Sequence, residues 1–198
     1  VNMLDTSRNY AMGESEKRIG IAIKENGGWP ENFILSTKID RNMETLVLDK
    51  KRTRESIEES LKTLNVDSVD ILFLHDPEYV KDVNDVTKKN GALDELFKIK
   101  EEGLAKAVGL AMGKINIMFP ILKNWDFDVI INHNRYTLLN READEMYSYA
   151  HSKNISIFNA APYAGGVLAK GPSNFKKITY QDVTCLLYTS DAADDRNC

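Results

Sequence analysis

Four side chains with complementary chemistry, Asp5, Tyr10, Lys38 and His75, lie near the ends of three predicted strands. A free phenol has a pKa of about 10 and is a weak acid at neutral pH. The ammonium of Lys38 would favour a Tyr10 phenolate, and Asp5 would keep that lysine charged and oriented. Tyr10 would then exchange a proton with a substrate oxygen to which His75 also hydrogen-bonds. None of the four can carry a hydride, so a cofactor would have to do so.

Each of these residues is a weak signal when taken alone. A single Tyr or Lys after a strand is usually structural or solvated, and Asp5 by itself is able to cap a turn. The case for chemistry is that all four share the same end of successive strands. Polar groups at such positions are usually there for chemistry, since a core position would penalise them. The set therefore predicts a catalytic site.

Strand-like and helix-like patterns alternate along the chain. The predicted strands are 1–4, 33–39, 71–74, 105–111, 127–132 and 155–160, and the predicted helices are 15–25, 53–64, 92–102, 115–123 and 142–152. Strict alternation implies an α/β fold with parallel strands and right-handed helical crossovers. No G-x-G-x-x-G follows the first strand, which favours a (β/α)8 TIM barrel over an open dinucleotide-binding sheet. We therefore expect an incomplete barrel with about six of its eight βα units.

The composition is that of an ordinary soluble globular protein, with 42% apolar and 28% charged residues among 198. A net charge of −4 without a basic stripe argues against a nucleic-acid partner. The longest apolar runs are strand-sized, which argues against a membrane partner. Two cysteines, Cys185 and Cys198, form no disulfide framework, and no signal-peptide pattern is present, which favours a cytoplasmic location. The oligomeric state stays open.

The two ends of the chain predict a barrel that is truncated at both ends. The first residues already follow a strand pattern and include no initiator Met at position 1. Residues 181–198 show no strand or helix period that matches the preceding units. We expect a partial barrel over residues 1–180 and a non-native or disordered tail over residues 181–198.

Four stretches of the chain resemble the aldo-keto reductases. They are D-T-S-R-N-Y-A-M-G-E-S-E at 5–16, S-T-K at 36–38, the run 56–75 and G-A-L-D-E-L at 91–96. The resemblance covers about residues 1–172 and implies a (β/α)8 barrel that binds NADP or NAD across its C-terminal mouth. It also implies direct hydride transfer, with the family's catalytic tetrad at Asp5, Tyr10, Lys38 and His75.

Three further segments, at 75–77, 134–139 and 159–162, resemble the sugar 1-dehydrogenase branch of that family. Members of this branch include D-threo-aldose, L-fucose and L-galactose dehydrogenases. The resemblance implies a small sugar or aldehyde substrate and oxidation of an aldose at C1, from lactol to lactone. In that direction Tyr10 would act as the base.

The cofactor contacts of the family carry over less directly. Many members have Ser-Asn after the fourth strand, where this chain has Ala111-Met112. Backbone groups of Ala111 and Met112 would then replace the side-chain contact to the nicotinamide carboxamide. His133 aligns with a frequent Gln, and it is either a carboxamide contact or a satisfied barrel histidine.

The segment after the sixth strand is expected to be a loop that lines the cofactor site. Ala160 stands where a stacking Tyr is usual in the family, and Pro162 and Tyr163 follow it. Tyr163 would cover the nicotinamide ring or have an ordinary packing role. The basic loop that grips the 2′-phosphate would follow Gln181, so the sequence does not separate NADP from NAD.

Two other interpretations remain open. Some relatives with the same tetrad are auxiliary channel subunits, so the protein could be a cofactor-binding regulatory subunit without significant turnover. It could also be an inactive fragment, because parts of the barrel are absent. Turnover on an aldose would separate an enzyme from both.

Overall fold

The computed structural model describes residues 2–170, so the predicted tail at 181–198 lies outside the described residues. Six strands follow one another in the sheet order β1-β2-β3-β4-β5-β6, with helices between them in the sequence. This sequential order is that of a (β/α)8 barrel, and the predicted incomplete barrel is confirmed. No helix within residues 2–170 combines the length and apolarity needed to cross a bilayer. The chain divides into two compact units, 1–130 and 131–198.

The first unit is built on four parallel strands. They are β1 (Met3–Asp5), β2 (Ile34–Ile39), β3 (Val69–His75) and β4 (Ala105–Met112). The register places Asp5 opposite Ser36 and His75 opposite Ala111. Because parallel strands end at the same edge of a sheet, the ends of β1, β2 and β3 bring their polar residues together.

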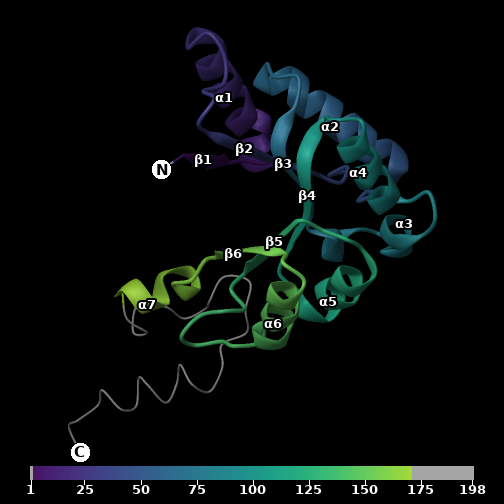
Figure 1. Ribbon diagram of the computed structural model, residues 1–198, viewed down its shortest axis with the longest axis vertical. Coiled ribbons are helices and arrows are strands. Elements are labelled where there is room, and N and C mark those ends of the chain that lie inside the picture. The colour runs from purple at the N-terminus through teal and green to yellow at the C-terminus, as the bar shows by residue number, and fades with distance from the viewer. Residues whose placement is uncertain (1, 171–198) are drawn as a thin grey trace, which may run out of the picture. The chain divides into compact units, whose positions relative to one another are not determined.

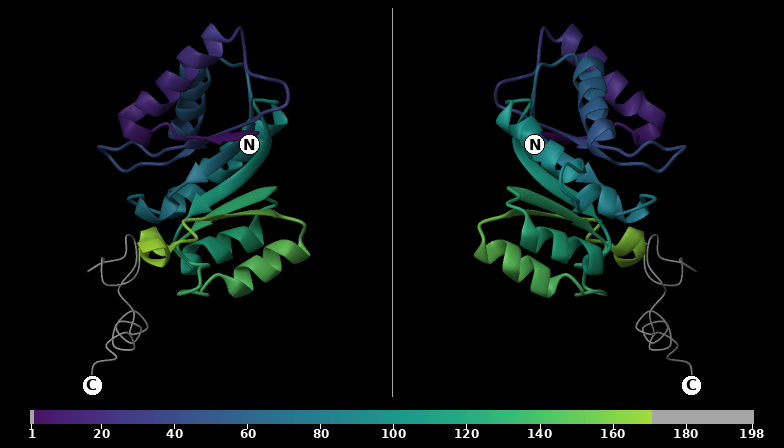
Figure 2. Two further views of the ribbon diagram at one scale, coloured as in Figure 1. Left: turned by 90° about the vertical axis from the view of Figure 1, so that its left-hand side faces the viewer. Right: turned by 90° about the vertical axis from the view of Figure 1, so that its right-hand side faces the viewer.

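Helices α1 (Glu14–Glu25), α2 (Lys50–Leu64) and α4 (Ala92–Glu101) lie along one face of this sheet (Figure 1 and Figure 2). The first unit also contains η1 (Tyr10–Gly13), η2 (Pro77–Tyr79), α3 (Asn84–Thr87) and α5 (Ile115–Asn124). Helix α2 packs between α1 and α4. Its apolar positions Ile57 and Leu64 are fully buried, as are Leu72 and Phe73 of β3. The 3.6-residue period of α2 thus builds the core beneath the site.

Helices α1 and α2 approach each other closely at Gly20. A Cβ atom added there would lie 2.0 Å from the carbonyl oxygen of Thr63, well inside van der Waals contact. The side-chain amide of Asn65, which ends α2 in a left-handed conformation, donates to the Gly20 carbonyl at 3.1 Å. Glycine at position 20 is therefore required for this spacing between the two helices.

The second unit contains α6 (Asp144–Ser152), β6 (Ser156–Ala160), η3 (Ala164–Gly166) and α7 (Val167–Lys170), and β5 (Val129–His133) leads into it. Ala164 and Val167 form a small core with Leu139 and Leu168. The sequence predicted a loop at 162–166, and this prediction was wrong in part because η3 begins at Ala164. A three-residue turn is too short to show a helical period.

Candidate active site

The segment between β1 and α1 carries the predicted phenol. Asp5 is the last residue of β1, and Tyr10 opens the short helix η1 with 42% of its surface exposed. Ala11, Met12 and Gly13 then follow with φ values of 51°, 57° and 90°. Two consecutive non-glycine residues in the left-handed region are uncommon, and such strain often accompanies functional sites. Of these three residues only Gly13 is of a type that adopts positive φ without steric cost.

Lys38 is buried, with 2% of its surface exposed, and its ammonium meets three groups. Its Nζ lies 2.5 Å from Asp5 Oδ2 and 2.7 Å from the Thr6 carbonyl oxygen. It also lies 4.7 Å from the centroid of the Tyr10 ring. Ser36 Oγ donates to the other carboxylate oxygen of Asp5 at 2.8 Å. The ammonium, the carboxylate and the phenol are therefore neighbours.

His75 ends β3 and lies beside the phenol. The rings of Tyr10 and His75 meet edge to face, with centroids 6.0 Å apart. The Nδ1 atom of His75 lies 2.6 Å from Asp40 Oδ1, and its Nε2 lies 3.7 Å from Asp76 Oδ2. The structure thus brings Asp5, Tyr10, Lys38 and His75 together, and their chemical roles stay a prediction.

Asp40 belongs to the same cluster, although the sequence analysis did not single it out. It follows β2 directly and is 2% exposed. Its Oδ2 accepts hydrogen bonds from Ser7 Oγ at 2.5 Å and from the backbone N–H of Asn9 at 3.0 Å. Burial raises the pKa of the Asp40 carboxyl, but bonds from His75, Ser7 and Asn9 outweigh this and hold it below its ordinary value. Asp40 is therefore ionised at neutral pH.

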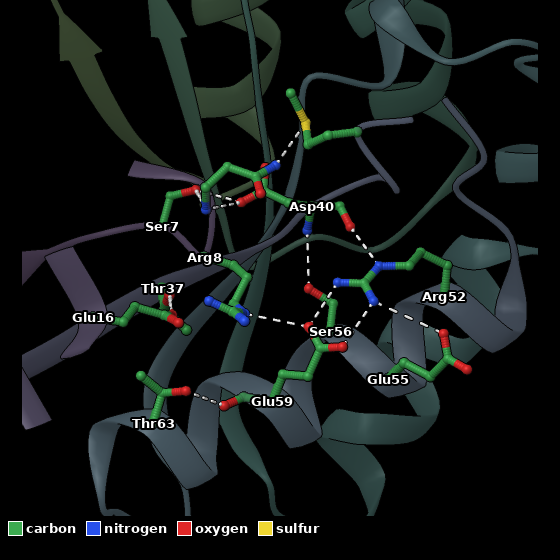
Figure 3. Close-up of polar contacts among 12 residues, drawn as sticks. Ser7, Arg8, Glu16, Thr37, Asp40, Arg52, Glu55, Ser56, Glu59 and Thr63 are labelled. Carbon is green, nitrogen blue, oxygen red and sulfur yellow. Dashed lines mark hydrogen bonds and ion pairs between the residues drawn. The ribbon is translucent and has the colours of Figure 1, made fainter. Parts of the chain in front are cut away.

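Helix α2 holds the main chain of Asp40 on both sides (Figure 3). The backbone N–H of Asp40 donates to Ser56 Oγ at 3.1 Å, and its carbonyl accepts from Arg52 Nε at 3.1 Å. Arg52 is itself fixed by a two-pronged contact to Glu59, at 3.1 and 2.9 Å. Because α2 packs on the sheet, it sets the position of the Asp40 carboxylate.

Glu16 is a second buried carboxyl, on the helix side of β2. It lies in the first turn of α1, is 0% exposed, and accepts a hydrogen bond from Thr37 Oγ1 at 2.6 Å. Burial raises its pKa, and the hydrogen bond from Thr37 only partly opposes this. Successive side chains of a strand alternate between its faces, so Thr37 points away from the cluster that Lys38 enters.

Comparison with known proteins decides the family. A family model described as "Aldo/keto reductase family" matches residues 1–183. The chain belongs to the aldo/keto reductase family. Among curated proteins, an L-galactose dehydrogenase of Arabidopsis thaliana is 31% identical over 184 residues, covering 87% of this chain and 54% of that protein. A D-threo-aldose 1-dehydrogenase of a Pseudomonas species is 29% identical over 195 residues, covering 86% of this chain and 58% of that protein.

Solved structures show the same fold. The holo form of an aldo-keto reductase from Bacillus halodurans superposes with a TM-score of 0.66 at 24% identity, covering 86% of this chain and 54% of that one. This chain therefore spans somewhat more than half the length of the relatives that it matches. The motifs at 5–16 and 56–75 had predicted the family correctly from the sequence.

Two of the predicted cofactor positions, Ala111 and Met112, lie at the end of β4. Ala111 and Met112 are 2% and 0% exposed, and a backbone contact from them to a cofactor stays a prediction. The Ala111 carbonyl accepts a hydrogen bond from the backbone N–H of Asp76 at 2.8 Å. A carbonyl oxygen has two lone pairs, so this bond leaves capacity for a second donor.

The other predicted cofactor positions of this aldo/keto reductase lie in the second unit. The Nδ1 atom of His133, at the end of β5, is 3.4 Å from Nδ2 of the Asn134 side chain. The Ala160 carbonyl accepts from the Asn134 backbone N–H at 3.2 Å. Pro162 is exposed, and Tyr163 exposes 64% of its surface. The Tyr163 ring is therefore accessible within this unit, and its contact with a cofactor stays a prediction.

Proposed function

We propose that the whole protein is an NADP- or NAD-dependent oxidoreductase that oxidises the C1 hydroxyl of an aldose to a lactone. The observation that carries this proposal is the buried ammonium of Lys38, held 2.5 Å from Asp5 Oδ2 and 4.7 Å from the centroid of the Tyr10 ring. Membership of the aldo/keto reductase family supports it. The two relatives named as an L-galactose and a D-threo-aldose dehydrogenase support a sugar as the substrate.

Proton transfer at the substrate oxygen is the task of the clustered side chains. The Lys38 ammonium stabilises negative charge on the Tyr10 oxygen, and Asp5 holds that ammonium in place. The Tyr10 phenolate takes the proton of the C1 hydroxyl as the carbonyl forms. In the reverse direction the Tyr10 phenol returns the proton to the alkoxide. His75 contacts the same oxygen and orients it.

The chemistry of this donor set fits a cofactor that accepts a hydride. The cluster moves a proton at an oxygen, and none of its side chains can take up the hydride that leaves C1. A bound nicotinamide supplies that acceptor. We assign its binding to the backbone of Ala111 and Met112, to His133, and to the loop that includes Ala160, Pro162 and Tyr163. Each of these positions is an expected contact of the family fold.

Turnover of aldoses is the direct test. The purified protein is mixed with NAD⁺ or NADP⁺ and with L-galactose, L-fucose or D-arabinose, and absorbance at the nicotinamide band is followed. We expect turnover of at least one sugar with one of the two nucleotides. The Tyr10→Phe variant should lose about 10²–10⁴-fold in kcat and keep its nucleotide affinity, because only the proton-transfer group is removed. Tyr149→Phe on α6 removes a hydroxyl outside the cluster and should keep the rate.

The outcomes separate the three interpretations. Nucleotide binding without turnover of any aldose or aldehyde would refute the enzyme and favour a regulatory subunit. An absence of both binding and turnover would make the chain an inactive fragment. A Tyr10→Phe variant with the full rate would end the proton-transfer role of Tyr10, whatever the substrate.

A further inference from the structure

We propose that Asp40 is a positioning residue that fixes the tautomer of His75. In this assignment Nδ1 of His75 keeps its proton in every charge state, and Nε2 is the nitrogen that gains or loses one. The tautomer follows from the contacts of the imidazole and does not depend on the reaction. The consequence for the substrate oxygen rests on the function proposed above.

Nδ1 of His75 carries a proton because the Asp40 carboxylate that faces it can only accept a hydrogen bond. Nδ1 lies 2.6 Å from Asp40 Oδ1, and an ionised carboxylate can only accept hydrogen bonds. Asp40 is ionised because its hydrogen bonds hold its pKa below the ordinary value. Ser7 Oγ lies 3.4 Å from Nδ1, but its hydroxyl donates to Asp40 Oδ2 at 2.5 Å and does not compete for the position.

The acceptor cannot turn away from the imidazole. The Asp40 main chain is bonded to Ser56 and Arg52 of α2 on its two sides. The backbone N–H of Asn9 donates to Oδ2 at 3.0 Å, which leaves Oδ1 for the histidine. These contacts hold the carboxylate in one orientation, and an acceptor that is fixed in this way selects one tautomer of its histidine.

The charged and titratable groups that face the His75 ring belong to this cluster. Asp40 follows β2 and bonds Nδ1, and Asp76 follows β3 with its Oδ2 3.7 Å from Nε2. The Tyr10 ring of η1 meets the imidazole edge to face, and the Lys38 ammonium lies 4.7 Å from the centroid of that phenol ring. Nε2 has no carboxylate within hydrogen-bonding distance among these groups, so it is the nitrogen available to a substrate.

A fixed tautomer makes the role of His75 depend on its charge. With the proton held on Nδ1, a neutral His75 presents Nε2 only as an acceptor. The imidazolium presents an Nε2–H donor. A carbonyl substrate therefore receives a hydrogen bond from the charged form alone, and this bond is lost when Nε2 is deprotonated.

Replacement of Asp40 by asparagine should reverse the tautomer. The Asn9 backbone N–H is a donor that no rotation can turn into an acceptor, so it holds the new amide oxygen where Oδ2 was. The amide NH2 then faces Nδ1 and forces it to accept, and the proton of the neutral ring moves to Nε2. The Ser7→Ala variant is the matched control, because it removes one donor to Asp40 and leaves the carboxylate in place.

Nitrogen-15 NMR of the imidazole rings reads the tautomer directly. The chain has three histidines, and comparison with a His75→Gln variant identifies the His75 signals. We expect the neutral wild-type ring to carry its proton on Nδ1, Ser7→Ala to do the same, and Asp40→Asn to carry it on Nε2. A proton on Nε2 in the wild type overturns the proposal even if Asp40→Asn fails to fold.

The pH profile of carbonyl reduction gives the second readout. In the wild type, kcat/KM should fall by about tenfold per pH unit once the Nε2–H donor of His75 is lost. The fall assigned to His75 is the one that the His75→Gln variant lacks. Asp40→Asn should lack it too, since its neutral ring keeps an Nε2–H. A fall that survives in Asp40→Asn overturns the positioning role. An inactive protein with the proton on Nδ1 refutes the proposed function and leaves the tautomer in place.

Discussion

Two buried carboxyls with opposite electrostatics lie on opposite sides of the sheet at β2: Asp40, directly after the strand, and Glu16, in the first turn of α1. Asp40 and Glu16 are 2% and 0% exposed, so depth alone does not distinguish them. On the site face, Asp40 receives hydrogen bonds from His75, Ser7 and a backbone N–H, and its pKa is lowered although burial raises it. On the helix face, Glu16 is bonded by the hydroxyl of Thr37, and burial keeps its pKa raised. The number and kind of donors therefore decide whether a buried carboxyl holds a charge.

The comparison explains why one face suits chemistry and the other suits packing. A charged carboxylate on the site face can orient a histidine and keep its proton in place. A carboxyl with a raised pKa on the helix face ties α1 to the sheet and is most stable when it is neutral. Substitutions on each face test this contrast through their effects on activity and on the free energy of unfolding.

Removal of the charge on the site face should abolish most of the activity. The Lys38→Met variant keeps most of the unbranched side chain but loses the ammonium between Asp5 and Tyr10. We expect kcat to fall by at least about 100-fold, because the phenolate loses its stabilising charge. Steady-state turnover measures the loss, and Lys24→Met at the exposed end of α1 serves as the control. A Lys38→Met enzyme with normal kcat would show that the site face needs no buried cation.

The Asp40→Asn variant should be less stable than the wild type at neutral pH. Its buried donors lose a charged acceptor, which costs about 1–3 kcal/mol of unfolding free energy. A lowered pKa gives stability that is present above the ordinary value of 3.8 and lost as the pH falls through the folded-state value. The difference should therefore shrink below pH 3.8, and urea unfolding between pH 7 and pH 3 measures it. A difference that grows towards acid would contradict the lowered pKa.

The Glu16→Gln variant should show the opposite dependence on pH. A raised pKa means that the folded wild type binds a proton which the unfolded chain releases above its ordinary value of 4.5. Stability of the wild type then falls as pH rises from 4.5 through the folded-state pKa. The variant lacks this fall and should match or exceed the wild type by about 1 kcal/mol at pH 8. Glu14→Gln, in the same turn but exposed, should keep the wild-type slope in urea unfolding.

We expect the smallest difference in stability between variants of two neighbouring hydroxyls on β2, those of Thr37 and Ser36. Thr37→Val removes a donor from the buried Glu16 and should cost about 1 kcal/mol at pH 7. Ser36→Ala removes a donor from Asp5, which is still bonded by Lys38, and should cost less than about 0.5 kcal/mol. Paired unfolding curves measure both values. The reverse order would mean that the carboxyl on the helix face depends less on its donor than the one on the site face.

The strand ends explain how much of the site could be predicted from the sequence. Lys38 lies near the end of β2 and His75 ends β3, so the common edge of the parallel strands places them near Asp5. The same rule applies to Asp40, which follows β2, but its partner Ser7 lies in a loop whose path no periodicity specifies. Nothing in the sequence separates Glu16 from any other acid in the first turn of a helix, and only the fold shows that it is buried.

Other features of the structure could not be predicted from the periodicity of the sequence. Ala11 and Met12 have no preference for the left-handed region, so only the fold could reveal their conformation. The helices α3 and α7 have four residues each, which is too few to show a period. The cofactor positions from His133 to Tyr163 came from family likeness rather than from residue chemistry, and they stay predictions.

The close crossing of α1 and α2 at Gly20 has a consequence for the phenol. Helix α1 begins directly after η1, so a helix pushed outward would draw Tyr10 with it and away from the lysine below. We therefore expect the side chain at position 20 to affect the distance between Tyr10 and Lys38. Even the methyl group of an alanine at position 20 would push α1 away from α2, and the displacement would extend to Tyr10 at the start of η1.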